Sequence, residues 1–327
     1  MKSRVFITFL CTFALFFLAS CNHGGNKKEE VAYVFTYFNK NGAAGLQMAY
    51  SYDGYTWTAV NGNQPLFAPM VGGKLMRDPS ICQGPDGIFH LVWTTGWWEN
   101  NIGHATSEDL LNWSAQQEIP VMKDYPGVVN TWAPELFYDD EEGLFYIFWA
   151  STVPGAEGIT TGGGKEDGKT NHRIYCTTTK DFKEFTPTRL WFNPDFSAID
   201  AAVIRSPRTG RYIMAVKNEN AGIQDEIPAE KNIRITRSDK MKVGFPTAVS
   251  GPIDTTGVWM EGPTMIYIGN DLLMYYDEYK EHKYGASISH DDGGSWEDVS
   301  DRISLPEGTR HGTAIAVPRR FVDAIAQ

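Results

Sequence analysis

The stretch Trp259–Tyr279, "WMEGPTMIYIGNDLLMYYDEY", predicts two short β-strands joined by a tight turn. An apolar run follows Glu261, the residues Gly-Asn-Asp supply a turn, and a second run rich in Leu, Met and Tyr completes the pattern. A carboxylate at the edge of an apolar strand is costly unless a partner or a ligand uses it. The stretch therefore predicts a β-hairpin in which Glu261 has a specific task.

The same pattern occurs three more times along the chain. In each unit an acidic residue precedes an apolar strand, a turn bearing Gly, Asp or Asn follows, and a second apolar or aromatic strand comes next. A third strand then ends in a Ser/Thr-x-Asp-like turn, which we interpret as structural, and an aromatic residue suits the start of a fourth. Four strands per unit, at a spacing of roughly 50–65 residues, are typical of propeller blades. The other copies begin with "RDPSICQGPDGIFHLVWTTG" (77–96), "WAPELFYDDEEGLFYIFWAS" (132–151) and "AIDAAVIRSPRTGRYIMAVKNE" (198–219).

A fifth unit is split between the two ends of the chain. The run "RHGTAIAVP" at 310–318 predicts one inner strand, and "AYVFTYFN" (32–39) with "GLQMAYSYDGYTWTAV" (45–60) predicts the other three. Joining these segments closes the ring and removes exposed sheet edges. The sequence therefore predicts an all-β fold, a five-bladed β-propeller formed by residues 31–327 as one domain. A stack of antiparallel sheets without closure is the alternative.

The N-terminus has the features of an export signal. Lys2 and Arg4 precede an apolar stretch at 5–18, which has the length of a signal-peptide core and is too short for a comfortable membrane span. The residues "LASC" at 18–21 resemble the lipobox of bacterial lipoproteins. This resemblance implies a signal peptide at 1–20, lipidation of Cys21, a polar tether at 21–30, and anchoring to the bacterial cell envelope, facing the periplasm or the outside. An ordinary secretory signal cut near the same place is the alternative.

Composition narrows the set of partners. The formal net charge of −11 argues against nucleic acid or anionic lipid as the main partner and is compatible with a neutral substrate such as a sugar. Besides Cys21, the cysteines of the mature chain are Cys82 and Cys176, each in a strand-like run, and we expect both to be free thiols. We expect no nucleic-acid partner, and we expect a monomer.

A propeller brings the first residues of its innermost strands together at one mouth of the central channel. The residues at these positions are Asp78, Glu135, Asp200, Glu261 and His311. Each has a structural explanation when taken alone; an Asp before Pro, for example, can cap a turn. Crowded carboxylates raise one another's pKa values, and a fold that gathers them usually uses them as acid and base or as cation ligands. Their recurrence in successive blades favours a functional site.

The ordered motifs "RDPSI", "WAPEL", "AIDAAVI", "MEGPTMI" and "RHGTAIAV" resemble those of glycoside hydrolase family 43 over nearly all of the mature chain. That family consists of five-bladed propellers that remove arabinofuranosyl, xylosyl or galactosyl units. The resemblance implies that Asp78 is the general base, that Asp200 orients and tunes the acid, and that Glu261 is the general acid. His311 matches an axial histidine associated with channel waters or a cation, commonly calcium, and Glu135 matches a position outside the catalytic three.

Two departures from the family pattern stand out. Ala201 follows Asp200 where the family often has Pro, and the base motif lies behind three N-terminal strands. The first weakens the assignment of Asp200, and the second leaves the numbering of the blades open.

The resemblance implies an inverting, exo-acting glycoside hydrolase, with an α-L-arabinofuranosidase or β-xylosidase as the expected activity on an oligo- or polysaccharide. Two alternatives remain open: a surface glycan-binding lipoprotein without catalysis, and a propeller glycosidase or phosphorylase of another sugar specificity. No cofactor is required for the chemistry; a Ca²⁺ in the central channel, held through waters at His311, is compatible with the resemblance. The expected substrate-binding residues are Trp97, Trp98, Trp132, Glu135, Trp259, Arg310 and His311.

Overall fold

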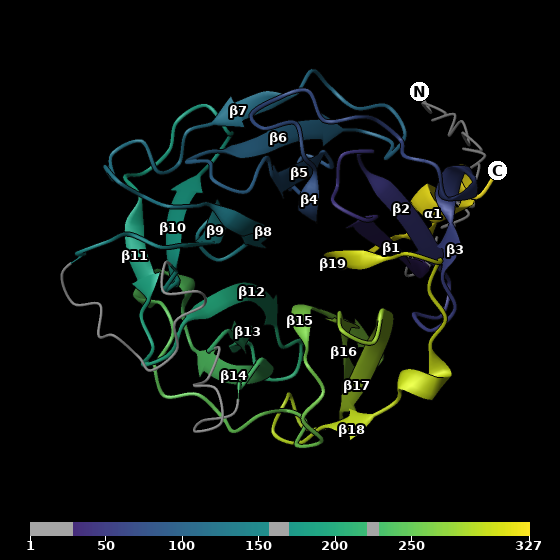
Figure 1. Cartoon of the computed structure of the whole chain (residues 1–327). Coiled ribbons are helices and arrows are strands. Elements are labelled where there is room, and N and C mark those ends of the chain that lie inside the picture. Colours follow the sequence, from purple (N-terminus) through teal and green to yellow (C-terminus); the bar gives the residue numbers. More distant parts are fainter. Residues whose placement is uncertain (1–28, 157–169, 221–228) are drawn as a thin grey trace, which may run out of the picture.

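The computed structural model describes residues 29–156, 170–220 and 229–327, and within them five antiparallel sheets surround a central axis (Figure 1). The predicted all-β, five-bladed propeller is confirmed. The predicted signal peptide 1–20, Cys21 and the tether up to residue 28 lie outside the described residues. Within each sheet, the strands are named here from the axis outward. The first two sheets are β4 (Arg77–Gln83), β5 (Phe89–Thr94), β6 (Ile102–Ser107) and β7 (Gln117–Ile119), and β8 (Trp132–Asp139), β9 (Leu144–Ser151), β10 (Arg173–Thr179) and β11 (Arg189–Phe192). The other three are β12 (Ala198–Arg205), β13 (Tyr212–Asn218) and β14 (Asn232–Ser238); β15 (Glu261–Ile268), β16 (Asp271–Glu278), β17 (Lys283–Ser289) and β18 (Glu297–Asp298); and β19 (Arg310–Pro318), β1 (Val31–Phe38), β2 (Gln47–Ser51) and β3 (Thr58–Ala59).

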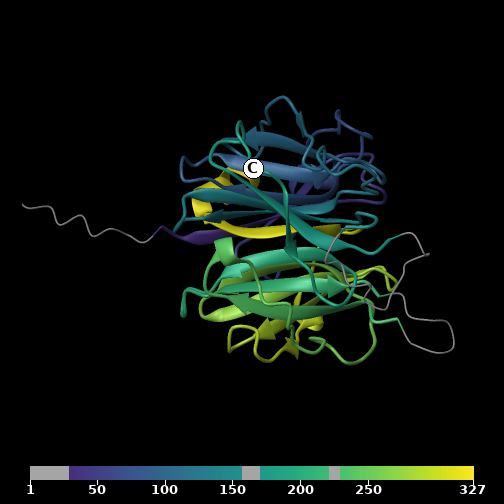
Figure 2. The same ribbon diagram turned by 90° about the vertical axis from the view of Figure 1, so that its left-hand side faces the viewer.

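The last of these sheets closes the ring, as the sequence predicts. Strand β19 pairs antiparallel with β1, in a register that runs from Val31 opposite Pro318 to Thr36 opposite Thr313. Figure 2 shows the yellow C-terminal strand lying among the strands of the ring. The two backbones approach so closely that a Cβ at Gly312 would lie 1.8 Å from the carbonyl oxygen of Thr36. The closure therefore depends on glycine at this position.

Apolar side chains fill the space between neighbouring blades. One cluster, for example, joins Tyr146 and Phe148 of β9 to Met214 of β13, all almost completely buried. The strands are buried on both faces because each sheet packs against two neighbours, which explains their continuous apolar runs. A short helix, α1 (Arg319–Ile325), follows β19. In the described part of the chain, no helix has the length and apolar character needed to cross a membrane.

The blade of β12 differs from the prediction of four strands per unit, since its described residues form three. The segment that follows β14 still bonds to the backbone of that strand, through Ser250 to Ile235 and Ile253 to Ile233. It is rich in breakers, including Pro246 and Pro252. Proline has no N–H for a ladder, so the segment follows the strand without joining the sheet.

Two local predictions are also borne out by the fold. Cys82 and Cys176 are both free thiols. The Ser/Thr-x-Asp turns stabilise their own loops, as when the Asp53 carboxylate accepts bonds from the backbone N–H groups of Tyr55 and Thr56. These turns hold the hairpins of the blades and take no part in the pocket described below.

The closing contact generates a testable prediction. Gly312→Ala places a methyl group against the Thr36 carbonyl and should lower the free energy of unfolding by about 1–3 kcal/mol, as overpacking does. Gly251→Ala is the matched control, because a Cβ there meets no heavy atom within 4 Å, and it should change stability by less than about 0.5 kcal/mol. Urea unfolding followed by tryptophan fluorescence measures both. Equal stability of the two variants would contradict the closure argument.

Candidate active site

Four of the inner strands carry a β-bulge near their first residues. The pairing shifts register between residues 77 and 80, 132 and 135, 199 and 202, and 261 and 264. A residue with positive φ occupies each bulge: 50° at Asp78, 47° at Ala133, 51° at Asp200 and 55° at Gly262. A bulge re-aims side chains and bends the strand. Strained backbone of this kind is costly for non-glycine residues and concentrates at functional sites.

The bulges correct the expectation that the acidic residues share one structural position. Asp78 and Asp200 are equivalent, whereas Glu261 lies one residue before that position and Glu135 lies two residues after it. The reason at Glu261 is steric. A Cβ at Gly262 would lie 2.3 Å from the imidazole Cγ of His311, so the equivalent position admits only glycine and the carboxylate comes from the preceding residue.

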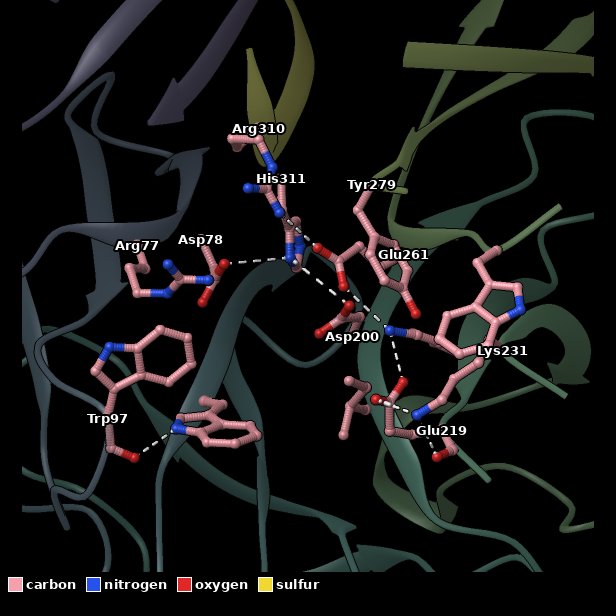
Figure 3. Close-up of a pocket in the computed structure, with 14 residues that line it drawn as sticks. Arg77, Asp78, Trp97, Asp200, Glu219, Lys231, Glu261, Tyr279, Arg310 and His311 are labelled. Atoms are coloured by element: carbon pink, nitrogen blue, oxygen red, sulfur yellow. Dashed lines mark hydrogen bonds and ion pairs between the residues drawn. The ribbon is translucent and has the colours of Figure 1, made fainter. Parts of the chain in front are cut away.

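These strand ends surround a cavity of about 360 Å³ at one mouth of the channel. In Figure 3, Asp78 lies on one side of His311, and Glu261 and Asp200 lie on the other. Arg77 and Trp97 stand on the side of Asp78, and Tyr279, Glu219 and Lys231 stand on the side of Glu261. The residues that line the cavity are Arg77, Asp78, Trp97, Trp132, Ile199, Asp200, Lys217, Glu219, Lys231, Trp259, Glu261, Tyr279, Arg310 and His311.

Asp78 is held as a carboxylate. Burial raises its pKa, but the hydrogen bond and charge of His311, together with Arg77, outweigh burial and lower the pKa to about 2. The Nδ1 atom of His311 lies 3.4 Å from Asp78 Oδ1, and the Thr94 hydroxyl donates to Oδ2 at 2.9 Å. Thr94 is itself oriented, because its hydroxyl oxygen accepts a bond from the Ala133 N–H at 2.8 Å. The Asp78 carboxylate is therefore both ionised and fixed in direction.

Asp200 and His311 form the centre of the site. Burial raises the pKa of Asp200, and the nearby Glu261 and Asp78 raise it further, against the opposing charges of His311 and Lys217. The Gly262 N–H donates to Asp200 Oδ2 at 3.0 Å and so ties this carboxyl to the backbone beside Glu261. Burial lowers the pKa of His311, but Asp200 and Asp78 dominate and raise it to about 9. At neutral pH the imidazole is a cation between two acidic groups.

Glu261 contacts two cations, one at each oxygen. Lys217 Nζ lies 3.1 Å from Oε2, and Arg310 Nη2 lies 3.1 Å from Oε1. Arg310 is anchored from behind by Asp277, at 2.5 Å from its Nε. Burial and the charge of Glu261 raise the pKa of Asp277 to about 6, with Arg310 opposing. These contacts explain why a strand begins with a carboxylate: Glu261 lies in the pocket, where two cations bind it.

Lys217, Glu219, Lys231 and Tyr279 line the pocket but were missed by the sequence analysis. Lys217 is the penultimate residue of the buried strand β13, and its side chain is only 1% exposed. Burial opposes its charge, yet Glu219 and Glu261 raise its pKa well above the ordinary value. The signal was present in the sequence, because a charged residue in an apolar strand is the same feature that singled out Glu261.

Most of the predicted substrate-binding residues meet at the pocket, and two do not. Trp97, Trp132, Trp259, Arg310 and His311 line it. The Trp132 Nε1–H donates to the carbonyl of Trp97 at 2.7 Å, which locks these two rings together. Trp259 is partly covered, because the ammonium of Lys280 lies 3.1 Å from its ring centroid.

Glu135 and Trp98 lie elsewhere. Glu135 is half-buried further along the inner strands, where it accepts a bond from the Thr313 hydroxyl at 2.9 Å. Burial raises its pKa to about 7, and it lines a different cavity, one that is bordered by Cys82. Trp98 is 62% exposed and packs its ring against Trp132, with the centroids 5.7 Å apart. The register of the bulge explains Glu135, whose side chain follows the strand away from the mouth.

The described residues do not offer a ready set of ligands for calcium. Within the described ranges, no three His, Cys, Asp or Glu side chains are grouped so as to hold a metal ion. His311 is a cation at neutral pH and engages Asp78 and Asp200, so the residues present do not fit a directly bound metal. The channel calcium stays a prediction, and no chemical step below is routed through it.

Comparisons with known proteins agree with this geometry. A family model described as "Probable glycosyl hydrolase domain", of a group related to glycoside hydrolase family 43, matches residues 29–323. An α-L-arabinofuranosidase of Bifidobacterium longum subsp. longum is 25% identical over 249 residues, which are 67% of this chain and 23% of that protein. The chain therefore matches about a quarter of the length of this curated relative.

Solved structures share the fold at low sequence identity. The α-L-arabinofuranosidase from Lactobacillus brevis is 19% identical, with a TM-score of 0.51 over 74% of this chain and 74% of that one. An exo-β-1,3-galactanase from Clostridium thermocellum is 13% identical, with a TM-score of 0.51 over 73% of this chain and 50% of that one. These similarities support the propeller architecture.

The charge on His311 generates a prediction about pH and stability. Its folded pKa of about 9 lies above the ordinary 6.5, so its contribution to stability is fully present below about pH 6.5 and is lost as the pH rises through about 9. The difference in unfolding free energy between wild type and His311→Gln should shrink by roughly 1–3 kcal/mol between pH 6 and pH 9.5. Urea titrations at several pH values measure it. If NMR showed that the His311 imidazole loses its proton below pH 7, the assignment of a positive charge to His311 at neutral pH would be refuted.

Proposed function

The chain belongs to the glycosyl hydrolase family related to glycoside hydrolase family 43, and we propose that it is an inverting glycosidase that removes terminal sugar units from glycans. The observation that carries the proposal is the placement of Asp78 and Glu261 on opposite sides of His311 in one pocket, with Asp200 on the side of Glu261. Inverting hydrolysis needs one ionised and one protonated carboxyl group on the two sides of the anomeric carbon.

Asp78 is suited to the role of general base. Its pKa of about 2 keeps it ionised, and Thr94 and His311 fix its orientation. In the proposed reaction, Asp78 takes a proton from a water molecule while the water oxygen forms a bond to the anomeric carbon. The bond from that carbon to the leaving oxygen breaks on the opposite face, which inverts the configuration.

Glu261 is suited to the role of general acid. It donates its proton to the leaving oxygen as the glycosidic bond breaks, and it ends the step as a carboxylate. Lys217 and Arg310 lie 3.1 Å from its two oxygens and would stabilise that charge. Asp200, hydrogen-bonded to the backbone N–H that follows Glu261, favours the protonated form of the acid before the reaction, since two adjacent negative charges repel.

The size and walls of the pocket support a terminal sugar as the substrate. A cavity of about 360 Å³ is at the small end of the range for ligand sites, which suits one sugar ring and part of the next. Trp97 and Trp132 offer apolar surface on the side of Asp78. The similarity to α-L-arabinofuranosidases favours an arabinofuranosyl unit, with xylosyl and galactosyl units as alternatives. The substrate would be an oligo- or polysaccharide, and the protein would act as a monomer.

The anchoring of the protein is a separate part of the proposal. The sequence "LASC" at 18–21 after an apolar segment supports processing before Cys21 and attachment of acyl chains to it. A lipid anchor would hold the propeller at the bacterial cell envelope, where it would contact glycans outside the cytoplasm.

Anchoring is tested by Cys21→Ser in cells that express the full chain. The wild-type protein should fractionate with membranes and incorporate labelled palmitate, whereas Cys21→Ser should lose the label and leave the membrane fraction. If wild-type protein carries no label and is found in the soluble fraction, Cys21 is not a lipid attachment site.

The catalytic roles are tested with Asp78→Asn and Glu261→Gln. Each should lower kcat by about 10²–10⁴-fold on the glycoside that the wild-type protein cleaves, because each removes one acid or base step. The assay uses 4-nitrophenyl α-L-arabinofuranoside, β-D-xyloside and β-D-galactoside, followed by product stereochemistry from ¹H NMR. The matched controls are Asp301→Asn and Glu108→Gln, which make the same chemical change at exposed positions. Full activity in both site variants, or retained configuration in the product, would sink the assignment; binding of glycans without any product would favour the non-catalytic alternative.

A further inference from the structure

Six charged side chains of alternating sign form a continuous row on the Glu261 side of the pocket. Neighbours in the row are 2.6 Å apart for Lys231 and Glu219, 2.6 Å for Glu219 and Lys217, 3.1 Å for Lys217 and Glu261, 3.1 Å for Glu261 and Arg310, and 2.5 Å for Arg310 and Asp277. Figure 3 shows part of this row, with its contacts dashed. Such a row is expensive to bury, because every charge must be desolvated.

Lys217 is the member of the row whose position most needs an explanation. Its side chain is 1% exposed, whereas that of Glu261 is 19% exposed. A structural explanation would make Lys217 the counter-ion of the buried Glu219. Glu219, however, already has the ammonium of Lys231 at 2.6 Å from its other oxygen, and the same ammonium donates to its backbone carbonyl at 2.9 Å. Neutralising Glu219 therefore does not require a second buried lysine.

What distinguishes Lys217 from Lys231 is its contact with Glu261. Lys217 reaches Oε2 of Glu261, while Arg310 occupies Oε1, so the carboxyl group is held at both ends. Glu219 keeps the Lys217 ammonium in place, and Lys231 keeps Glu219 in place. Among these residues, Lys217 alone joins the buried part of the row to the acid.

We propose that Lys217 is a positioning residue for the general acid: it fixes the Glu261 carboxyl group and stabilises the negative charge that Glu261 acquires when its proton passes to the leaving oxygen. This inference rests on the proposed function, because it gives Lys217 a task only if Glu261 donates a proton. In this role the ammonium acts through its contact with Glu261.

The physical effect has a definite sign. A cation beside a carboxyl group stabilises its ionised form, so Lys217, 3.1 Å from Glu261, favours transfer of the proton from Glu261 to the leaving oxygen, and its loss makes that transfer harder. The benefit is greatest for a leaving group that needs full protonation, such as a sugar hydroxyl. A leaving group that is already a stable anion gains little from a stronger acid.

The test compares wild type with Lys217→Met on a series of aryl glycosides of the cleaved sugar, from 2,4-dinitrophenyl to phenyl, over a range of pH. We expect the basic limb of kcat/KM to move to higher pH, because the variant removes an opposite charge beside the acid. We expect kcat on the phenyl glycoside to fall by about 10–100-fold, within the range of an impaired acid step. On the dinitrophenyl glycoside the loss should be less than about threefold.

Lys283→Met is the matched control. It makes the same substitution at an ion-paired lysine outside the pocket, 2.9 Å from Glu278, so the basic limb should keep its wild-type position. Lys217→Arg retains the charge and should restore that position as well. If Lys217→Met fails to fold, as judged by circular dichroism, Lys217→Gln removes the charge while keeping a hydrogen-bond donor, and the same shift is expected.

The outcomes separate this inference from the proposed function. If the wild-type protein cleaves a glycoside and the folded Lys217 variants keep its pH profile and its dependence on the leaving group, Lys217 is only a structural counter-ion and the inference is overturned. If Lys283→Met shifts the limb as much as Lys217→Met, the specific contact with Glu261 is also refuted. If the wild-type protein releases no sugar from any glycoside, the proposed function fails, and the role of Lys217 fails with it.

Discussion

The antiparallel pairing of β19 with β1 is the interaction on which the site depends. It joins the first and last strands of the chain, and it places His311 at the axis between Asp78 and Asp200. The same strand begins with Arg310, one of the two cations at Glu261. The strand that closes the ring therefore also supplies two residues of the site. A chain that left this sheet open would lose both the sheet edge protection and the central cation that holds two carboxyl groups together.

Backbone strain at the inner strand ends is the second constraint. Asp78 and Asp200 adopt positive φ angles that are uncommon for residues other than glycine, and they do so at bulges that aim their side chains at the pocket. The cost of such a conformation is about 1–3 kcal/mol for each residue. It is offset here by the fixed contacts of each side chain, such as the hydrogen bond from the Gly262 N–H to Asp200. The site is thus built on rigid strands, which suits chemistry that needs well-placed groups.

Much of this arrangement could be predicted because its signals are local. Turn residues and apolar runs define the hairpins, their repetition defines the blades, and the need to avoid open edges defines the closure. In the described part of the chain, the β12 blade has three strands where the sequence predicts four, because the segment beside β14 contains Pro246 and Pro252, which have no N–H to donate to a ladder. The sequence predicts Glu135 at the mouth of the channel because a sequence motif does not reveal a β-bulge, and the bulge between Trp132 and Glu135 shifts its side chain along the strand.

The row of charged side chains beside Glu261 was not predicted, for a different reason. Lys217 and Glu261 are 44 residues apart in sequence and belong to different blades, so nothing local links them. A search centred on the first residues of the inner strands found Glu261 and Arg310 but missed Lys217, which belongs to the second strand of its blade. The rule that buried charges come in pairs would have directed attention to a lysine in an apolar strand, even without its partner being known.

The pocket also illustrates how a carboxyl group can be prepared for two opposite demands. A general acid must hold its proton before the reaction and release it during the reaction. In the proposed mechanism, the two demands on Glu261 fall on different neighbours: Asp200 is tied to the backbone N–H that follows it, while Lys217 and Arg310 stabilise the charge that appears when the proton is transferred. The balance of buried charges, rather than any one carboxylate, is what makes the site suited to acid catalysis.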